Sequence, residues 1–160
     1  RLCPRGTAGC GHFLMRNVIV LGASAAALFA VGAFAHSGAT GVVKQRMDGM
    51  KEMSHAVKAI GAVKAGAIPF SFETLNLAGR EIAKHGVSAR DQFPEGSLVS
   101  PSDALPAIWA DRQTFDRLME QMIDAADQLA VSADRDESIA LTDRIGGYCK
   151  DCHATFRKQK

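Results

Sequence analysis

Two cysteines and a histidine lie within five consecutive positions near the end of the chain. Cys149, Cys152 and His153 form the pattern Cys-x-x-Cys-His in the stretch GYCKDCHATFRK. On a helix, positions three and four apart share one face, so both thiols and the imidazole would gather within about one 5.4 Å turn. The spacing therefore brings two sulfurs and a metal-binding nitrogen into one compact group.

This pattern is the attachment signal for a covalently bound haem. Each thiol can add to one of the two vinyl groups on a haem edge, and the two thioethers would fix the ring to the helix. Imidazole is a standard ligand of haem iron, and His153 directly follows the second thiol. We predict that Cys149 and Cys152 carry one haem c per chain and that His153 binds its iron.

Three other uses of the two cysteines stay open at this point. A thioredoxin-like redox pair has the same Cys-x-x-Cys spacing, but it occurs in a βαβ setting, and strand-favouring runs are scarce here. A structural zinc site needs about four ligands. A simple disulfide gives the adjacent histidine no role. The histidine and the helical setting favour haem over these three.

An apolar run near the start of the chain is typical of a secretory signal peptide. The run NVIVLGASAAALFAVGAFA follows Met15 and Arg16 and ends in Ala-Phe-Ala. A short basic start, an apolar core and an A-x-A end are the three parts of such a signal. We predict that residues 1–35, an upstream extension plus the signal peptide, are removed and that residues 36–160 form a periplasmic domain. A membrane anchor is the alternative, because the run is just long enough to span a bilayer.

Removal of this leader changes the charge and the cysteine inventory. The leader holds three of the 19 basic residues, none of the 17 acidic residues and two of the four cysteines. The remaining chain is close to neutral, so nothing in it indicates a nucleic-acid binder, and we expect no membrane contact after cleavage. Its two remaining cysteines would lie in a compartment that favours disulfides.

Hydrophobic periodicity predicts helices throughout residues 36–160. Apolar residues recur every seven positions over about residues 40–64, which indicates an amphipathic helix. A second helix follows Ser71, a suitable N-cap, and is predicted to end at Gly86. The next stretch, residues 87–105, contains two prolines, a glycine and several small polar residues. We predict a long loop there.

Two more helices complete the predicted domain. The third starts near Pro106, a residue favoured in a first helical turn, and the fourth opens at Asp136 or Ser138 and carries the Cys-x-x-Cys-His group. Four amphipathic helices predict an all-α fold, an antiparallel up-down-up-down four-helix bundle with a covalent haem near its C-terminus. The many Ala and Gly residues would leave thin helix walls and room for a bulky apolar group.

The sequence resembles the class II cytochromes c, the cytochrome c-prime family. The resemblance covers most of residues 36–160 and rests on the segments VVKQRMDGM, FPEGS, ALPAIW and CKDCHATFRK. The last segment is specific, and the other three support it. The resemblance implies a four-helix bundle with the haem motif on the last helix. It also implies that Arg46 lies near a haem propionate and that Arg157 is a basic residue beside the iron-binding His153.

The resemblance leaves the second axial position of the iron open. Met50 occupies the family's distal position on the first helix, one turn beyond Arg46. In some members a methionine there binds iron and gives a six-coordinate, low-spin centre. In others a bulky residue, even methionine, only blocks the site, and the iron stays five-coordinate and binds small gases. We favour iron binding by Met50.

The expected function follows from this choice. His/Met ligation raises the reduction potential and suits electron transfer, so we predict a non-enzymatic carrier of single electrons that meets redox partner proteins. The alternative implied by the resemblance is a five-coordinate protein that binds NO or CO at the distal haem face. Relatives often pair through their first two helices, so the resemblance also leaves a homodimer open.

Overall fold

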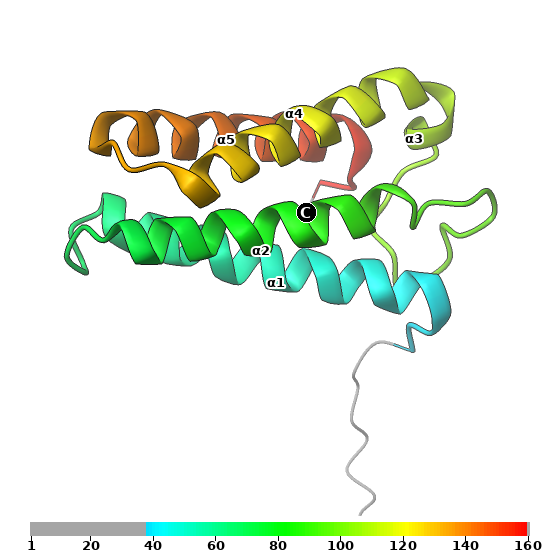
Figure 1. Cartoon of the computed structure of the whole chain (residues 1–160). Helices are drawn as coiled ribbons and strands as arrows, with labels where there is room; N and C mark the ends of the chain where they lie inside the picture. The colour runs from blue at the N-terminus through cyan, green and yellow to red at the C-terminus, as the bar shows by residue number, and fades with distance from the viewer. Residues whose placement is uncertain (1–37, 160) are drawn as a thin grey trace, which may run out of the picture. The chain divides into compact units, whose positions relative to one another are not determined.

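The computed structural model describes residues 38–159, which form five helices (Figure 1). These helices are α1 (Gly41–Lys64), α2 (Phe72–Arg90), α3 (Ala107–Ala110), α4 (Arg112–Val131) and α5 (Arg135–Phe156). The predicted leader, residues 1–35, lies outside the described residues. Within residues 38–159, no helix has both the length and the apolar character that crossing a membrane requires.

The four long helices form the antiparallel bundle that the sequence predicts. Figure 1 shows α1 and α2 as one layer and α4 and α5 as the other. Helix α1 packs mainly on α2, α2 on α4, and α4 on α5, whereas α1 and α5 scarcely touch. The bundle is thus less closed between its first and last helices, where the candidate site lies.

Helices α2 and α4 approach closely because α2 carries glycines at their contact. A Cβ atom at Gly79 would lie 2.7 Å from both the Ala126 carbonyl oxygen and the Ala130 nitrogen, and one at Gly86 would lie 2.8 Å from a methionine methyl group on α4. A side chain at Gly79 would clash with the backbone of α4, and one at Gly86 would force the Met122 and Ile123 side chains to shift. The prediction that Gly86 ends the second helix is therefore wrong. It lies inside α2, which continues to Arg90 because this glycine serves packing rather than helix termination.

Side-chain caps fix where two helices begin. Ser71 Oγ accepts a hydrogen bond from the Thr74 N–H at 3.2 Å, which confirms the predicted N-cap. Asp111 has a non-helical backbone conformation, and its carboxylate accepts from the Thr114 N–H at 3.1 Å. The predicted third helix is therefore divided into α3, a single turn, and the longer α4.

The start of the last helix differs from the prediction. We expected Asp136 or Ser138 to open it, but α5 begins at Arg135. Asp134 supplies the cap, because its extended backbone lets its carboxylate accept from the Glu137 N–H at 2.8 Å. Asp134, Asp136 and Ser138 are all residue types suited to an N-cap, and only the backbone geometry shows that Asp134 is the cap.

The connection between α2 and α3 contributes to the core. Phe93 in this connection is 6% exposed. Its ring packs edge-to-face on Phe115 of α4 with centroids 5.1 Å apart, and Phe115 packs in the same way on Phe156 of α5 at 5.5 Å. The Trp109 indole N–H donates to the Phe93 carbonyl at 3.0 Å. The predicted loop therefore begins after Arg90 and is held in place by buried aromatic residues.

Candidate functional site

The two cysteines lie on the inner side of α5. Cys149 and Cys152 are both half-buried and pack against the hydrophobic core, and their sulfurs are not joined to each other. The Cys149 thiol lies 3.9 Å from the Met122 sulfur on α4. The helical spacing predicted from the sequence is confirmed, since both thiols lie within one continuous helix.

Burial raises the pKa of both thiols. It is the cause of the shift at Cys149, and together with the smaller effect of charge on Cys149 it raises the pKa of Cys152 to about 11. Both sulfurs are therefore protonated at neutral pH, whereas reactive redox cysteines have a lowered pKa. This argues against the thioredoxin-like alternative. In the described part of the chain, no group of three His, Cys, Asp or Glu residues is arranged to hold a metal ion.

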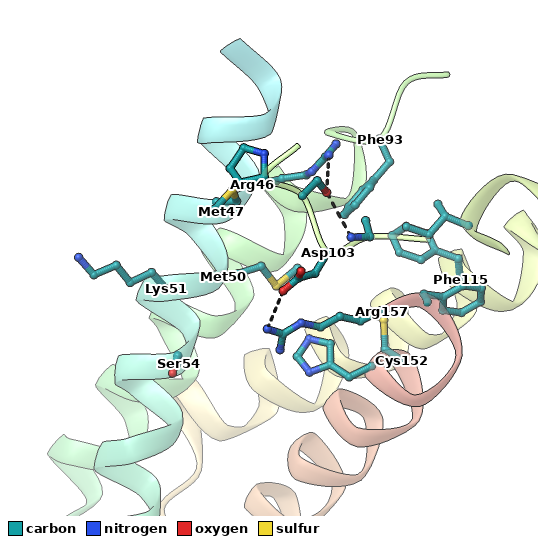
Figure 2. A pocket seen from close by; sticks show the side chains of 16 residues that line it. Arg46, Met47, Met50, Lys51, Ser54, Phe93, Asp103, Phe115, Cys152 and Arg157 are labelled. Atoms are coloured by element: carbon teal, nitrogen blue, oxygen red, sulfur yellow. Dashed lines mark hydrogen bonds and ion pairs between the residues drawn. The ribbon is translucent and has the colours of Figure 1, made fainter. Parts of the chain in front are cut away.

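A cavity of about 390 Å³ lies beside Cys152, whereas Cys149 packs against the core and does not line it (Figure 2). Its size is within the range of small-molecule and cofactor sites. Helix α1, helix α5, the connection before α3 and a set of buried apolar side chains form its walls. The lining residues discussed below are Arg46, Met47, Met50, Phe93, Ser102, Asp103, Phe115, Cys152, His153, Phe156 and Arg157.

The cavity brings together the predicted iron ligands. Met50 on α1 and His153 on α5 line it from different helices, and Cys152 lines it next to His153. Burial, and secondarily the positive charge of Arg157, lowers the pKa of His153. The imidazole is therefore neutral at neutral pH, which is the form that binds a metal. Met47 also lines the cavity from α1, so the chain offers two thioethers there.

Arg46 lies at the cavity but bonds mainly to the connection before α3. It is 3% exposed. Its Nη1 donates to the Gln92 carbonyl at 3.1 Å and to Ser97 Oγ at 2.9 Å, and its Nη2 donates to the Ser97 carbonyl at 2.6 Å and to Ser102 Oγ at 2.9 Å. The guanidinium also lies over the Phe93 ring, 4.9 Å from its centroid. These neutral acceptors employ all four terminal N–H groups, so only Nε–H is left to face another group.

Arg157 follows the last residue of α5 and contacts the same connection. Its Nη2 lies 3.4 Å from Asp103 Oδ2, and its backbone pairs with Ala104 in an isolated antiparallel bridge. Lys158 N–H donates to the Asp103 carbonyl at 2.8 Å. Arg46 and Arg157 thus bind successive parts of one segment from opposite sides of the cavity.

The family can now be assigned. A sequence model of the cytochrome C′ family matches residues 41–157, a range that includes all five helices. The chain belongs to the cytochrome c′ family. Members of this family carry covalently bound haem c, and the chain is accordingly a c-type haem protein.

Individual relatives agree with this assignment. Cytochrome c-556 from Agrobacterium tumefaciens (strain II Chrys) is 30% identical over 122 residues, which cover 75% of this chain and 99% of the relative. Cytochrome c′ from Rhodopseudomonas palustris (strain ATCC BAA-98 / CGA009) is 34% identical over 125 residues, covering 76% of this chain and 84% of the relative. The solved structure titled cytochrome c′ from Rhodopseudomonas palustris has a TM-score of 0.71 and 31% identity, covering 76% of this chain and 99% of that one.

The residues at the cavity fit a covalently attached haem. Three features are needed: thiols that point inward, a nitrogen ligand and an apolar surface for the ring. Cys149 and Cys152 are inward-facing and protonated, and His153 is neutral. Phe93, Phe115 and other core side chains supply the apolar surface. The residues present are therefore compatible with a haem attached to α5.

Sequence reasoning missed the residues that hold the connection before α3. Ser97, Ser102 and Asp103 interact with Arg46 or Arg157, yet all three lie in a stretch that was predicted only as a loop. Small polar residues are common in loops, so their types carry no special signal. The segment FPEGS, which supported the family resemblance, contains Ser97 and was the only available hint.

Proposed function

We propose that this cytochrome c′ family member transfers single electrons, with its haem iron bound by His153 and Met50. Cys149 and Cys152 hold the haem through two thioethers. When bound, the haem supplies the one-electron couple of its iron. The polypeptide makes and breaks no bond of a substrate. The single observation that carries the proposal is that Met50 and His153, on different helices, line one cavity beside Cys152.

Covalent attachment needs only the two thiols and the two vinyl groups. In each attachment a thiol S–H adds across a vinyl double bond, so that a carbon–sulfur bond and a carbon–hydrogen bond form. The thiol itself supplies the hydrogen, and the step needs no oxidant and releases no leaving group.

The environment of the two proposed ligands suits an electron carrier. Met50 is half-buried on α1 and can present its thioether to the cavity without ionising. Partial burial at the cavity wall and the charge of Arg157 lower the pKa of His153, which favours the neutral imidazole. A methionine ligand raises the reduction potential of haem iron, so the iron would accept an electron readily from a donor protein.

A second candidate function is reversible binding of NO or CO. Met50 is unbranched and flexible, so its side chain can fill the cavity without binding iron. In addition, α1 and α5 scarcely touch, which leaves α1 able to move away from the iron. The names of the relatives do not decide the matter, because cytochrome c-556 and cytochrome c′ both occur at about the same identity to this chain.

Optical spectra of the haem-containing protein test the two candidates. With Met50 as ligand, the ferric protein should be six-coordinate and low-spin, and the ferrous protein should bind CO slowly. Met50→Leu should convert it to a five-coordinate, high-spin form that binds CO rapidly. Met47→Leu is the matched control, because Met47 lines the same cavity from the preceding turn of α1, and it should leave the spectrum unchanged.

The alternative outcomes are equally distinct. A high-spin, five-coordinate spectrum of the unaltered ferric protein would reject Met50 as a ligand and support the gas binder. Loss of the low-spin spectrum in Met47→Leu rather than in Met50→Leu would assign the ligand to Met47. A denatured chain without attached haem would reject both candidates.

The proposal includes a periplasmic location and a protein partner. The periplasmic location is inferred from the predicted leader, residues 1–35, and from the proposed use of the two cysteines for haem rather than for a disulfide. Mass measurement of the mature protein from its own host should give a chain that starts at His36 and carries one haem. A mature chain that retains the apolar run would support the membrane anchor.

A further inference from the structure

The connection before α3 joins the two walls of the cavity. On the α1 side, Ser102 Oγ accepts from Arg46 Nη2 at 2.9 Å and also from the Ala104 N–H at 3.2 Å. On the α5 side, the Leu105 N–H donates to the Phe156 carbonyl at 2.9 Å. Residues 102–105 are therefore tied to α1 at one end and to the end of α5 at the other.

Asp103 lies between these two attachments. Its carbonyl accepts from the Lys158 N–H at 2.8 Å, and its neighbour Ala104 pairs with Arg157 in the backbone bridge. The backbone of Asp103 is thus fixed on both sides. Its carboxylate lies at the cavity and contacts the Arg157 guanidinium, with Oδ2 3.4 Å from Nη2 (Figure 2).

Arg157 in turn shares the cavity with His153. Both side chains line it, His153 from the last turn of α5 and Arg157 from the extended residue that follows the helix. The charge of the guanidinium therefore lies at the same cavity as the proposed iron ligand. The last turn is further held by Gln159, whose Nε2 donates to the His153 carbonyl at 2.9 Å.

We propose that Asp103 is a positioning residue for the iron centre. Its carboxylate holds the Arg157 guanidinium at a fixed place beside His153, so a residue outside the bundle helices helps to set the reduction potential. This inference rests on the proposed function only in taking His153 as the iron ligand. It does not depend on whether Met50 binds iron.

The exposure of the pair indicates that its role is electrostatic rather than stabilising. The Arg157 and Asp103 side chains are 44% and 37% exposed. Ion pairs at such positions contribute little to folding stability. A charge fixed close to haem iron, in contrast, shifts the relative free energies of its two oxidation states, and hydrogen bonding and charge near the cofactor are known determinants of its potential.

A double-mutant cycle on the haem-containing protein tests the proposal. Asp103→Asn, Arg157→Gln and the double variant are compared with the unaltered protein by optical redox titration. If the two charges acted independently, Asp103→Asn would shift the midpoint potential equally in both backgrounds. Positioning predicts that the shift in the Arg157→Gln background is less than half of the shift in the unaltered background.

Two further variants keep the result interpretable. Asp151→Asn removes an exposed carboxylate of α5 close to His153, and it should shift the potential equally in both backgrounds. Arg157→Lys keeps the positive charge but replaces the planar guanidinium with a single ammonium. Positioning predicts a shifted potential for this variant, even if Asp103→Asn does not fold.

The outcomes separate this inference from the proposed function. Equal shifts for Asp103→Asn in both backgrounds, no shift at all, or an Arg157→Lys protein with the unaltered potential would each overturn the positioning role. In all three cases, a covalent haem with a histidine-ligated spectrum would leave the proposed function intact. A chain without haem, or one whose iron is not bound by His153, would instead reject the proposed function.

Discussion

Replacement of Arg46 should loosen the cavity wall more than any other single substitution at the site. The side chain is 3% exposed and makes four hydrogen bonds, two to carbonyl oxygens and two to serine hydroxyls. In Arg46→Met the hydroxyls of Ser97 and Ser102 can rotate toward other partners, but the carbonyls of Gln92 and Ser97 lose theirs. Each buried group left without a partner costs about 1–3 kcal/mol.

The net effect is smaller than the sum of the lost bonds. Methionine fills much of the same volume and removes the need to bury a charge, which offsets part of the loss. We expect a decrease of about 3 kcal/mol in the free energy of unfolding. For a domain of this size, that corresponds to a melting temperature lower by roughly 10 °C. Thermal and urea unfolding of the haem-containing protein, followed by circular dichroism, would measure both quantities.

Two companion variants test how much the hydrogen bonds of Arg46 contribute to the free energy of unfolding. Arg46→Lys keeps the charge, but one ammonium cannot reach four acceptors spread over three residues, so it should lose most of the same stability. Arg80→Met is the control, because Arg80 is an exposed arginine whose bond to the Ala130 carbonyl is 3.4 Å long, and it should change stability by less than about 0.5 kcal/mol. If Arg46→Lys were as stable as the unaltered protein, the charge of Arg46 and not its bonds to the connection would matter, and our reasoning would be refuted.

Three other predictions address packing, capping and the thiols. Gly79→Ala should destabilise the protein by about 1–2 kcal/mol, because overpacking against two backbone atoms of α4 outweighs the better helix propensity of alanine. The control is Gly61→Ala, whose Cβ would meet nothing within 4 Å. It should be neutral or stabilise the protein by up to about 1 kcal/mol. Asp134→Ala should lower the free energy of unfolding by about 1 kcal/mol through loss of the α5 cap, and an unchanged urea midpoint would contradict this role. In the chain without haem, the rate of Cys152 alkylation should rise with pH around the pKa of about 11 rather than around the ordinary value of 9.0, because burial favours the protonated thiol. Mass spectrometry would measure this rate as a function of pH. A midpoint near 9 would show that the thiol is not buried in that chain.

The pH dependence of stability follows from the same thiols, with its sign set by the direction of the shift. Their pKa values are raised in the folded chain. The stability they contribute is therefore fully present below the unfolded value of 9.0 and is lost as pH rises above it, for Cys152 toward the folded value of about 11. Attachment of haem removes both ionisations, so the haem-containing protein should lack this alkaline loss.

The fold was predictable because its signals are local and repeat along the chain. The heptad spacing in α1 needs only the sequence, and so does the cap at Ser71. Helix ends were less predictable where one residue type has two uses. Glycine is a common residue at helix ends, but Gly86 lies inside α2, where α4 approaches closely. Asp134, Asp136 and Ser138 are all suitable caps, and the backbone conformation selects the first.

The sequence by itself determined the chemistry of the last helix. Cys149, Cys152 and His153 are close in the chain, so helical geometry alone brings them together whatever the rest of the molecule does. Only the tertiary structure decided what surrounds them. Met50 is about a hundred positions away from His153, and Asp103 reaches Arg157 from a connection with no regular pattern. Such contacts depend on how the helices pack and on where the connection runs between them. No local pattern of residue types in the sequence indicates either of these.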